Sequence, residues 1–334
     1  MFIELLSNYG LFLIKTLTVL ISILLIISFI VNSKKSDQSG SIEIKNVNKE
    51  LNSIEENIKK NILTKSDFKK FIKARKKSNK KLEKRLFVID FKGNIRASEI
   101  VSLRREVSGV ILSCKKGDEV LLRLENSGGT VHEHGLAASQ LKRIKDKKIP
   151  LTICVDKVAA SGGYMMACVA NKIIASPFAI IGSIGVLAQV PNFNKLLKDK
   201  GINFEQHTAG NYKRTVTMFG ENTDKDREKL NEQLEEIHVL FKNFITSQRK
   251  NIDIEKVATG EYWYGENALS LNLIDEVMTS DEYILAMREK FEITHIKYKP
   301  IKTFSDKISK ISSSFTNKAI GSLEQKNHDK NIFK

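Results

Sequence analysis

Ser161 lies in a short segment whose residue types suit nucleophilic chemistry. It is followed by Gly162 and Gly163, and it stands between a strand-like apolar run, 151–155, and a helix-like apolar run, 164–170. A serine at a strand-to-helix turn can present its hydroxyl beside free backbone N–H groups, because the first N–H groups of a helix have no partner within it. Ser161 is therefore a candidate nucleophile, although Ser-Gly-Gly alone also occurs in many ordinary turns.

A second glycine pair, Gly128 and Gly129, follows another strand-like run, 119–124, and precedes a helix-like run, 131–144. Glycines at such a turn let the backbone approach a ligand closely and point N–H groups at it. Turns that follow parallel strands meet at one edge of the sheet, where ligands bind. One turn can then donate N–H groups to an oxyanion while the other holds the nucleophile.

The residues alone leave the general base open. Three histidines, His132, His134 and His207, lie near these loops and permit a Ser-His-Asp arrangement. The alternative is Lys213, beside Arg214 in a glycine-containing loop. A lysine base must be neutral, and at the reference pKa of about 10.4 the neutral form costs roughly 4.6 kcal/mol at pH 7. Burial and a cationic neighbour reduce that cost, because both disfavour the ammonium.

The elements that position these turns alternate between strand-like and helix-like runs. This alternation predicts an α/β fold with a largely parallel sheet. The expected strands are 86–91, 119–124, 151–155, 172–175 and 184–189, and the main expected helices are 95–107, 131–144, 164–170 and 222–249. The uncharged run 173–190 is long enough for a membrane span, but its serines, glycines and proline favour strands and turns.

The ends of the chain differ in composition from this central part. Residues 10–31 form an apolar run in which Lys15 is the only charge, and we expect an uncleaved transmembrane helix within a membrane anchor, 1–31. A cleaved signal peptide is disfavoured because the first nine residues lack a basic region. Residues 32–84 suggest a basic helical spacer, or a lysine-rich contact with membrane lipid. The Lys- and Ser-rich residues 298–334 suggest a loose tail, which leaves 85–297 as the globular domain.

Charge and cysteine content limit the possible functions. The formal net charge is +16, but no basic stripe is interleaved with aromatic residues, so we do not expect nucleic-acid binding. The three cysteines are far apart and form no C-x-x-C pair. A zinc or redox site is therefore not expected, and no cofactor is predicted.

The ordered set of motifs resembles the signal peptide peptidase A family of serine proteases. The resemblance covers about 85–280 and includes an N-terminal anchor and basic spacer of the same kind. The matching pieces are LFVIDFKGNIRASE at 86–99, NSGG at 126–129 with GLAASQL after it, VDKVAASGGYMMA at 155–167, IGSIGV at 181–186 and HTAGNYKRTVTMFGENT at 207–223.

This resemblance implies a ClpP/crotonase-like fold and a Ser-Lys dyad. Ser161 matches the nucleophile, Lys213 the general base, and Ser183 a hydroxyl that orients the lysine amine. The N–H of Gly162, with that of Gly128 or Gly129, matches the oxyanion hole. One departure is visible: the family usually has Ser-Pro-Gly-Gly where this chain has Asn-Ser-Gly-Gly, so the rigid φ of a proline is missing.

The implied function is a membrane-anchored serine endopeptidase. Its substrates are expected to be peptides or unfolded segments near the inner membrane, such as cleaved signal peptides. Family members form homo-oligomers, and the lysine can come from a neighbouring chain. They work on the extracytoplasmic side, whereas Lys34 and Lys35 after the anchor favour a cytoplasmic domain; we expect the periplasmic side. The alternatives are a crotonase-type acyl-CoA enzyme and a catalytically inert membrane scaffold.

Overall fold

The computed structural model describes residues 2–33, 40–78 and 82–300, and the chain divides into two compact units. The first unit takes in both ends of the chain, up to Ser41 and from Lys299, and includes helix α1 (Phe2–Ser33). In the part of the chain that the structure describes, no helix combines the length and the hydropathy needed to cross a membrane. The predicted anchor is therefore not confirmed. The predicted tail lies, from residue 301, outside the described residues.

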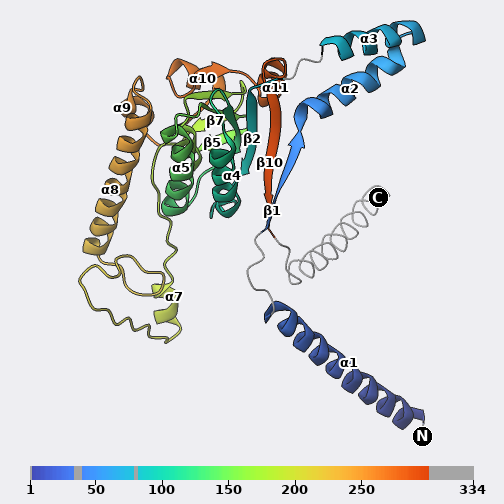
Figure 1. Cartoon of the computed structure of the whole chain (residues 1–334). Coiled ribbons are helices and arrows are strands. Elements are labelled where there is room, and N and C mark those ends of the chain that lie inside the picture. The colour runs from blue at the N-terminus through green and yellow to red at the C-terminus, as the bar shows by residue number, and fades with distance from the viewer. Residues whose placement is uncertain (1, 34–39, 79–81, 301–334) are drawn as a thin grey trace, which may run out of the picture. The chain divides into compact units, whose positions relative to one another are not determined.

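The second unit, residues 42–298, is built around a seven-stranded sheet (Figure 1). The strand order is β1-β10-β2-β3-β4-β6-β9, and neighbouring strands from β10 to β9 run parallel. The strands are β1 (Ser41–Asn46), β2 (Arg85–Lys92), β3 (Glu119–Glu125), β4 (Leu151–Val155), β6 (Lys172–Ala175), β9 (Glu276–Val277) and β10 (Glu292–Lys299). The predicted α/β architecture with a largely parallel sheet is confirmed.

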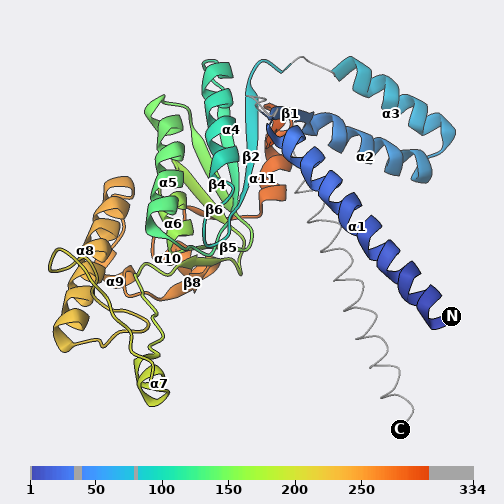
Figure 2. The same ribbon diagram turned by 90° about the horizontal axis from the view of Figure 1, so that it is seen from below.

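Side chains that alternate along the strands bury both faces of this sheet. On β2, Phe87 and Ile89 join a core cluster that includes α4 (Ile100–Ser113) and α5 (Val131–Asp146), which lie side by side (Figures 1 and 2). Leu86 and Val88, between them, join a second cluster with α11 (Ser280–Met287). Because successive side chains of a strand point to opposite faces, helices cover the sheet on both sides.

A smaller sheet carries the residues of interest. It has the order β5-β7-β8, and β5 pairs parallel with β7 while β7 pairs antiparallel with β8. The remaining elements are β5 (Val158–Ala160), β7 (Ile180–Gly182), β8 (Tyr262–Tyr264), α6 (Gly162–Ala167), α7 (Asn194–Asp199), α8 (Asp224–Gln248), α9 (Ile254–Val257) and α10 (Gly265–Ser270). The strand predicted at 184–189 is wrong. The extended segment is β7, which ends where Gly182 and Ser183 take φ values of +103° and +50°.

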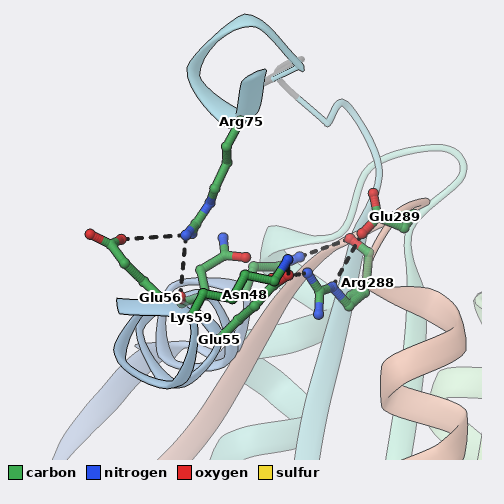
Figure 3. A network of polar contacts seen from close by, with 8 residues as sticks. Asn48, Glu55, Glu56, Lys59, Arg75, Arg288 and Glu289 are labelled. Carbon is green, nitrogen blue, oxygen red and sulfur yellow. Dashed lines mark hydrogen bonds and ion pairs between the residues drawn. The ribbon is translucent and has the colours of Figure 1, made fainter. Parts of the chain in front are cut away.

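The segment predicted as a spacer forms β1, α2 (Val47–Ile62) and α3 (Lys65–Ser78), and β1 lies beside β10. Figure 3 shows how α2 is attached to the domain. The Asn48 amide donates to the carbonyl of Arg288 at 2.9 Å and its oxygen accepts from the Ile293 N–H at 2.6 Å. Glu55 pairs with Arg288 at 3.1 Å and with Lys59 at 2.7 Å. These contacts place α2 in the same compact unit as the predicted domain.

Candidate active site

Ser161 stands at the junction of β5 and α6, as the sequence pattern suggested. Its N–H donates to the carbonyl of Gly182 at 2.7 Å, and its φ is +53°. A positive φ in a residue other than glycine is a strained conformation that persists only where surrounding contacts hold it. The side chain of Tyr164, fully buried on α6, donates its hydroxyl to the carbonyl of Leu273 at 2.9 Å. Burial raises the pKa of Tyr164, so this anchor remains a neutral hydrogen-bond donor.

Ser183 lies beside Ser161 because of the register of the small sheet. Ala160 pairs with Gly182 in the parallel ladder, and each is followed directly by one of the two serines. Ser183 also has a positive φ, +50°, and its N–H donates to the carbonyl of Glu261 at 2.6 Å. Two strained serines at equivalent positions of paired strands thus face the same edge of the sheet.

The Gly128 turn is in direct contact with the Ser161 turn. A β-carbon added to Gly128 would lie 2.7 Å from the Ser161 β-carbon and 3.0 Å from the nitrogen of Gly162. The φ of Gly128 is +91°, which also favours glycine. The two glycine-containing turns that the sequence singled out are therefore brought together, and the close approach leaves no room for a side chain at Gly128.

The backbone N–H groups of these turns are not equivalent. The N–H of Gly128 donates to the Asn126 side-chain oxygen at 2.6 Å. For the N–H groups of Gly129 and Gly162, no protein acceptor is found among the described residues. Of the three predicted oxyanion donors, Gly129 and Gly162 are the two that this arrangement leaves available to a ligand.

Lys213 lies apart from this cluster in the described structure. It is exposed, in a loop where its N–H donates to the carbonyl of Gly210 at 3.2 Å. The segment 191–223, which contains α7, projects away from the sheets in both Figure 1 and Figure 2. No hydrogen bond joins the Lys213 side chain to Ser161 or Ser183 within the described residues.

The histidines considered as alternative bases fall in different environments. His132 is exposed, and the His207 side chain is 89 % exposed, 3.4 Å from Glu205. His134 is buried directly behind Gly162, with its ring nitrogens 2.9 Å from the Thr130 carbonyl and 3.1 Å from the Asn126 side-chain oxygen. None of the three donates to or accepts from Ser161 in the described part of the chain.

Asn126 and His134 were not singled out together by the sequence. A usable signal was present, because an asparagine two residues before a glycine commonly accepts from that glycine's N–H. His134 carried no comparable signal, since its burial depends on the packing of α5 against the Ser161 turn. Among the described residues, no group of three or more histidines, cysteines and carboxylates is placed to hold a metal ion.

Comparison with known proteins identifies the family. Residues 143–294 match the model of peptidase family S49, and residues 4–141 match the model of the peptidase family S49 N-terminal region. "Probable protease SohB" of Haemophilus influenzae is 44% identical over 327 residues, which cover 92% of this chain and 93% of that protein. "Probable protease SohB" of Buchnera aphidicola subsp. Schlechtendalia chinensis is 49% identical over 301 residues, covering 84% and 98%. This chain belongs to peptidase family S49.

Both parts of the candidate site lie within the family matches. The S49 match includes Ser161, Ser183 and Lys213, and the N-terminal match includes the Gly128 turn. A solved structure, a mutant of the "1510-N membrane-bound stomatin-specific protease", is similar at 15% identity and a TM-score of 0.42, covering 61% of this chain and 84% of that one. From the family matches and the SohB relatives, the chain is a SohB-like S49 peptidase, and its own helices and strands form an α/β fold.

Proposed function

We propose that this S49 peptidase is a serine endopeptidase of ClpP/crotonase-like fold, in which Ser161 is the nucleophile and Lys213 the general base. The observation that supports it most strongly is the strained Ser161, with φ +53°, at the start of α6 and in contact with the Gly128 turn. This arrangement places the half-buried Ser161 beside N–H groups that have no acceptor within the described residues. The proposal concerns acyl transfer, because that chemistry requires a nucleophile and an oxyanion site within about 3 Å of one reacting carbon.

In the proposed mechanism, the Ser161 hydroxyl attacks the carbonyl carbon of a peptide bond while the Lys213 amine takes the hydroxyl proton. The N–H groups of Gly129 and Gly162 hold the oxyanion of the tetrahedral intermediate. Lys213 then protonates the leaving amine, and water hydrolyses the acyl-enzyme by the same route. Ser183 orients the lysine amine, a role consistent with its position next to Ser161 on the paired strand.

The exposed position of Lys213 requires a further step in this proposal. Either the segment 191–223 closes over the Ser161 turn, or the lysine of a neighbouring chain completes the site. A homo-oligomer supplies the second arrangement. It is the simpler of the two, because α7 and its loop already project away from the sheets of their own chain (Figure 1).

We further propose that the peptidase acts near a membrane on peptides or unfolded segments, signal-peptide-like ones included. The support is chemical: large apolar side chains of α1, among them Phe12, Leu17 and Ile26, are more than half exposed. We propose the inner membrane as the location, with the catalytic unit on the periplasmic side. Protease accessibility in spheroplasts and in inverted vesicles tests this location, and digestion only in inverted vesicles contradicts it.

The dyad is tested by Ser161→Ala and Lys213→Ala in the full chain. Each is expected to lower kcat for an apolar fluorogenic peptide on the order of 10⁴-fold. Ser161→Ala should also abolish labelling by a fluorophosphonate. The thermal midpoint should not change, because neither side chain makes a hydrogen bond to another part of the described structure.

Matched control variants are available elsewhere in the chain. Ser139→Ala on α5 and Lys200→Ala in the projecting segment change exposed residues of the same type, and both should retain wild-type turnover. Normal turnover by Lys213→Ala would exclude the dyad, and normal turnover by Ser161→Ala would exclude a serine mechanism at this site.

A further inference from the structure

Asn126 lies at the end of β3, and its backbone is fixed on both sides. Its N–H donates to the carbonyl of Val158 at 2.9 Å, and its carbonyl accepts from the N–H of Ala160 at 3.0 Å. The side chain is 1 % exposed, and its oxygen accepts from the N–H of Gly128 at 2.6 Å. A rigidly placed side-chain oxygen therefore determines the direction in which the Gly128 peptide plane points.

His134 connects this side chain to the other half of the site. The residue is fully buried on α5. One ring nitrogen lies 2.9 Å from the Thr130 carbonyl, and the other lies 3.1 Å from the same Asn126 oxygen that Gly128 contacts. The ring also packs on Gly162, where an added β-carbon would lie 2.4 Å from the His134 ring. One imidazole thus contacts both turns that supply the candidate oxyanion donors.

We propose that Asn126 and His134 are positioning residues that hold the oxyanion turn of this chain. Because Asn126 engages the Gly128 N–H, it restrains the next peptide plane, which carries the Gly129 N–H. One ring nitrogen of His134 contacts the Asn126 side-chain oxygen at 3.1 Å, and the ring sets the position of Gly162 by packing against it. This role rests on the proposed function, since it concerns where the two available N–H groups point.

The burial of this pair supports a role beyond packing. A buried polar group without a partner is costly, and the Asn126 amide nitrogen is buried with no partner among the described residues. A matched pair of apolar side chains would fill the same volume without that cost. The polar pair has a consequence that an apolar pair lacks: it gives the Gly128 N–H a fixed acceptor within a turn of two glycines. Glycine has the largest conformational freedom of any residue, so this turn depends on such a restraint.

The first test replaces each residue in the full chain and measures turnover of an apolar fluorogenic peptide. Asn126→Ala and His134→Phe should each lower kcat about 10- to 100-fold, less than removing an oxyanion donor outright. KM should change less than about threefold, because the substrate-binding surface is untouched. Asn126→Ser should retain more activity than Asn126→Ala, since a serine hydroxyl also accepts from the N–H two residues later.

The second test is independent of activity. Hydrogen exchange of the Gly128 amide should accelerate at least about tenfold in Asn126→Ala and in His134→Phe, with global unfolding unchanged. If His134→Phe does not fold, Asn126→Ala decides the test alone, and His134→Gln, which keeps a polar side chain at this position, should exchange more slowly than Asn126→Ala. His132→Phe is the matched control, because it makes the same change at an exposed position of the same helix.

A compensating substitution sharpens the test. The Ser127 side chain is exposed, and its φ is not positive. Ser127→Pro fixes φ at this position. In the Asn126→Ala background it should recover at least about half of the lost kcat.

Unchanged Gly128 exchange in both Asn126→Ala and His134→Phe would overturn the positioning role whatever the activity. If each variant loses thermal stability together with kcat, and Ser127→Pro restores no kcat, the role of the pair is only structural. That outcome also overturns the proposal. Peptide turnover that survives Ser161→Ala contradicts the proposed function instead, and the exchange rates still decide the role of Asn126 and His134.

Discussion

The turn at Ser161 and the loop at Lys213 are built in different ways. Ser161 is held by a strand ladder, by the Gly128 turn and by a helix whose residues are buried. Lys213 lies in an exposed segment with no regular structure between α7 and α8. The proposed nucleophile and the proposed oxyanion donors are therefore positioned by the fold itself. The position of the proposed base depends on contacts outside the packed core, which makes it the part of the site open to assembly or to regulation.

The largest expected effect comes from mixing two inactive chains. Ser161→Ala chains keep an intact lysine loop, and Lys213→Ala chains keep an intact nucleophile. If neighbouring chains complete each other's sites, a mixture should regain measurable peptidase activity that neither variant shows alone. Turnover of the fluorogenic peptide after the variants are co-expressed measures this.

The control for this experiment is a chain that carries both substitutions. Mixed with Ser161→Ala, it supplies no nucleophile and should give no activity. If the single variants co-purify as one oligomer and the mixture remains inactive, one chain supplies both residues, and the loop must close over its own Ser161 turn.

The same contrast explains what could be predicted from the sequence. The strands expected at 86–91, 119–124, 151–155 and 172–175 and the Ser161 turn followed from local patterns of apolar residues and glycines, and the structure contains them. The register that places Ser183 beside Ser161 could not be predicted in this way. The apolar pattern predicts a strand at 184–189, whereas the strand lies at 180–182. The pairing of β1 with β10 depends on residues far apart in sequence, so it carried no local signal.

The position of Lys213 also could not be derived from the sequence, and the physical reason is a different one. Residues 200–222 contain no helix or strand, and their large side chains are mostly exposed. No periodic apolar face exists there to fix the loop on the core. The motif in this loop therefore indicated a role for Lys213. The packing of the chain itself does not determine where the Lys213 side chain lies relative to Ser161.

A pair of glycine substitutions tests the difference in packing directly. Gly128→Ala introduces a β-carbon 2.7 Å from the Ser161 β-carbon at a φ of +91°, whereas Gly210→Ala, at a φ of +98°, meets nothing within 4 Å. Strain at such a φ costs about 1–3 kcal/mol, and the crowding at Gly128 adds to it. We expect Gly128→Ala to lower the free energy of unfolding by about 3 kcal/mol or more, and Gly210→Ala by about 1 kcal/mol.

Urea unfolding of the two variants measures these values, and fluorophosphonate labelling reports on Ser161. Labelling should be lost in Gly128→Ala and kept in Gly210→Ala. Equal destabilisation by the two substitutions would contradict the comparison, because it would mean that the Lys213 loop is packed as tightly as the Ser161 turn.

The smallest expected effect concerns a titratable group in the packed part of the domain, remote from both loops in sequence. Glu106 on α4 is 4 % exposed, and it accepts from the N–H of Tyr298 at 2.7 Å. Burial raises the pKa of Glu106 to about 7, although that hydrogen bond acts in the opposite direction. Because the folded state holds a proton that the unfolded chain releases at lower pH, this stabilisation is complete below about pH 4.5 and is lost as the pH rises through 7.

Glu106→Gln keeps an acceptor for the Tyr298 N–H but cannot ionise. At pH 8 the variant should be more stable than the wild type by about 1–3 kcal/mol in urea unfolding, and at pH 5 the two should be nearly equal. Glu235→Gln, an exposed substitution on α8, should show no such dependence on pH. A difference of the same size at both pH values would mean that Glu106 is ionised throughout. Since the substitution lies in the packed core, peptidase turnover should stay at the wild-type level. This result would separate the pH dependence of stability, which Glu106 causes, from the pH dependence of turnover, which the proposed base Lys213 would cause.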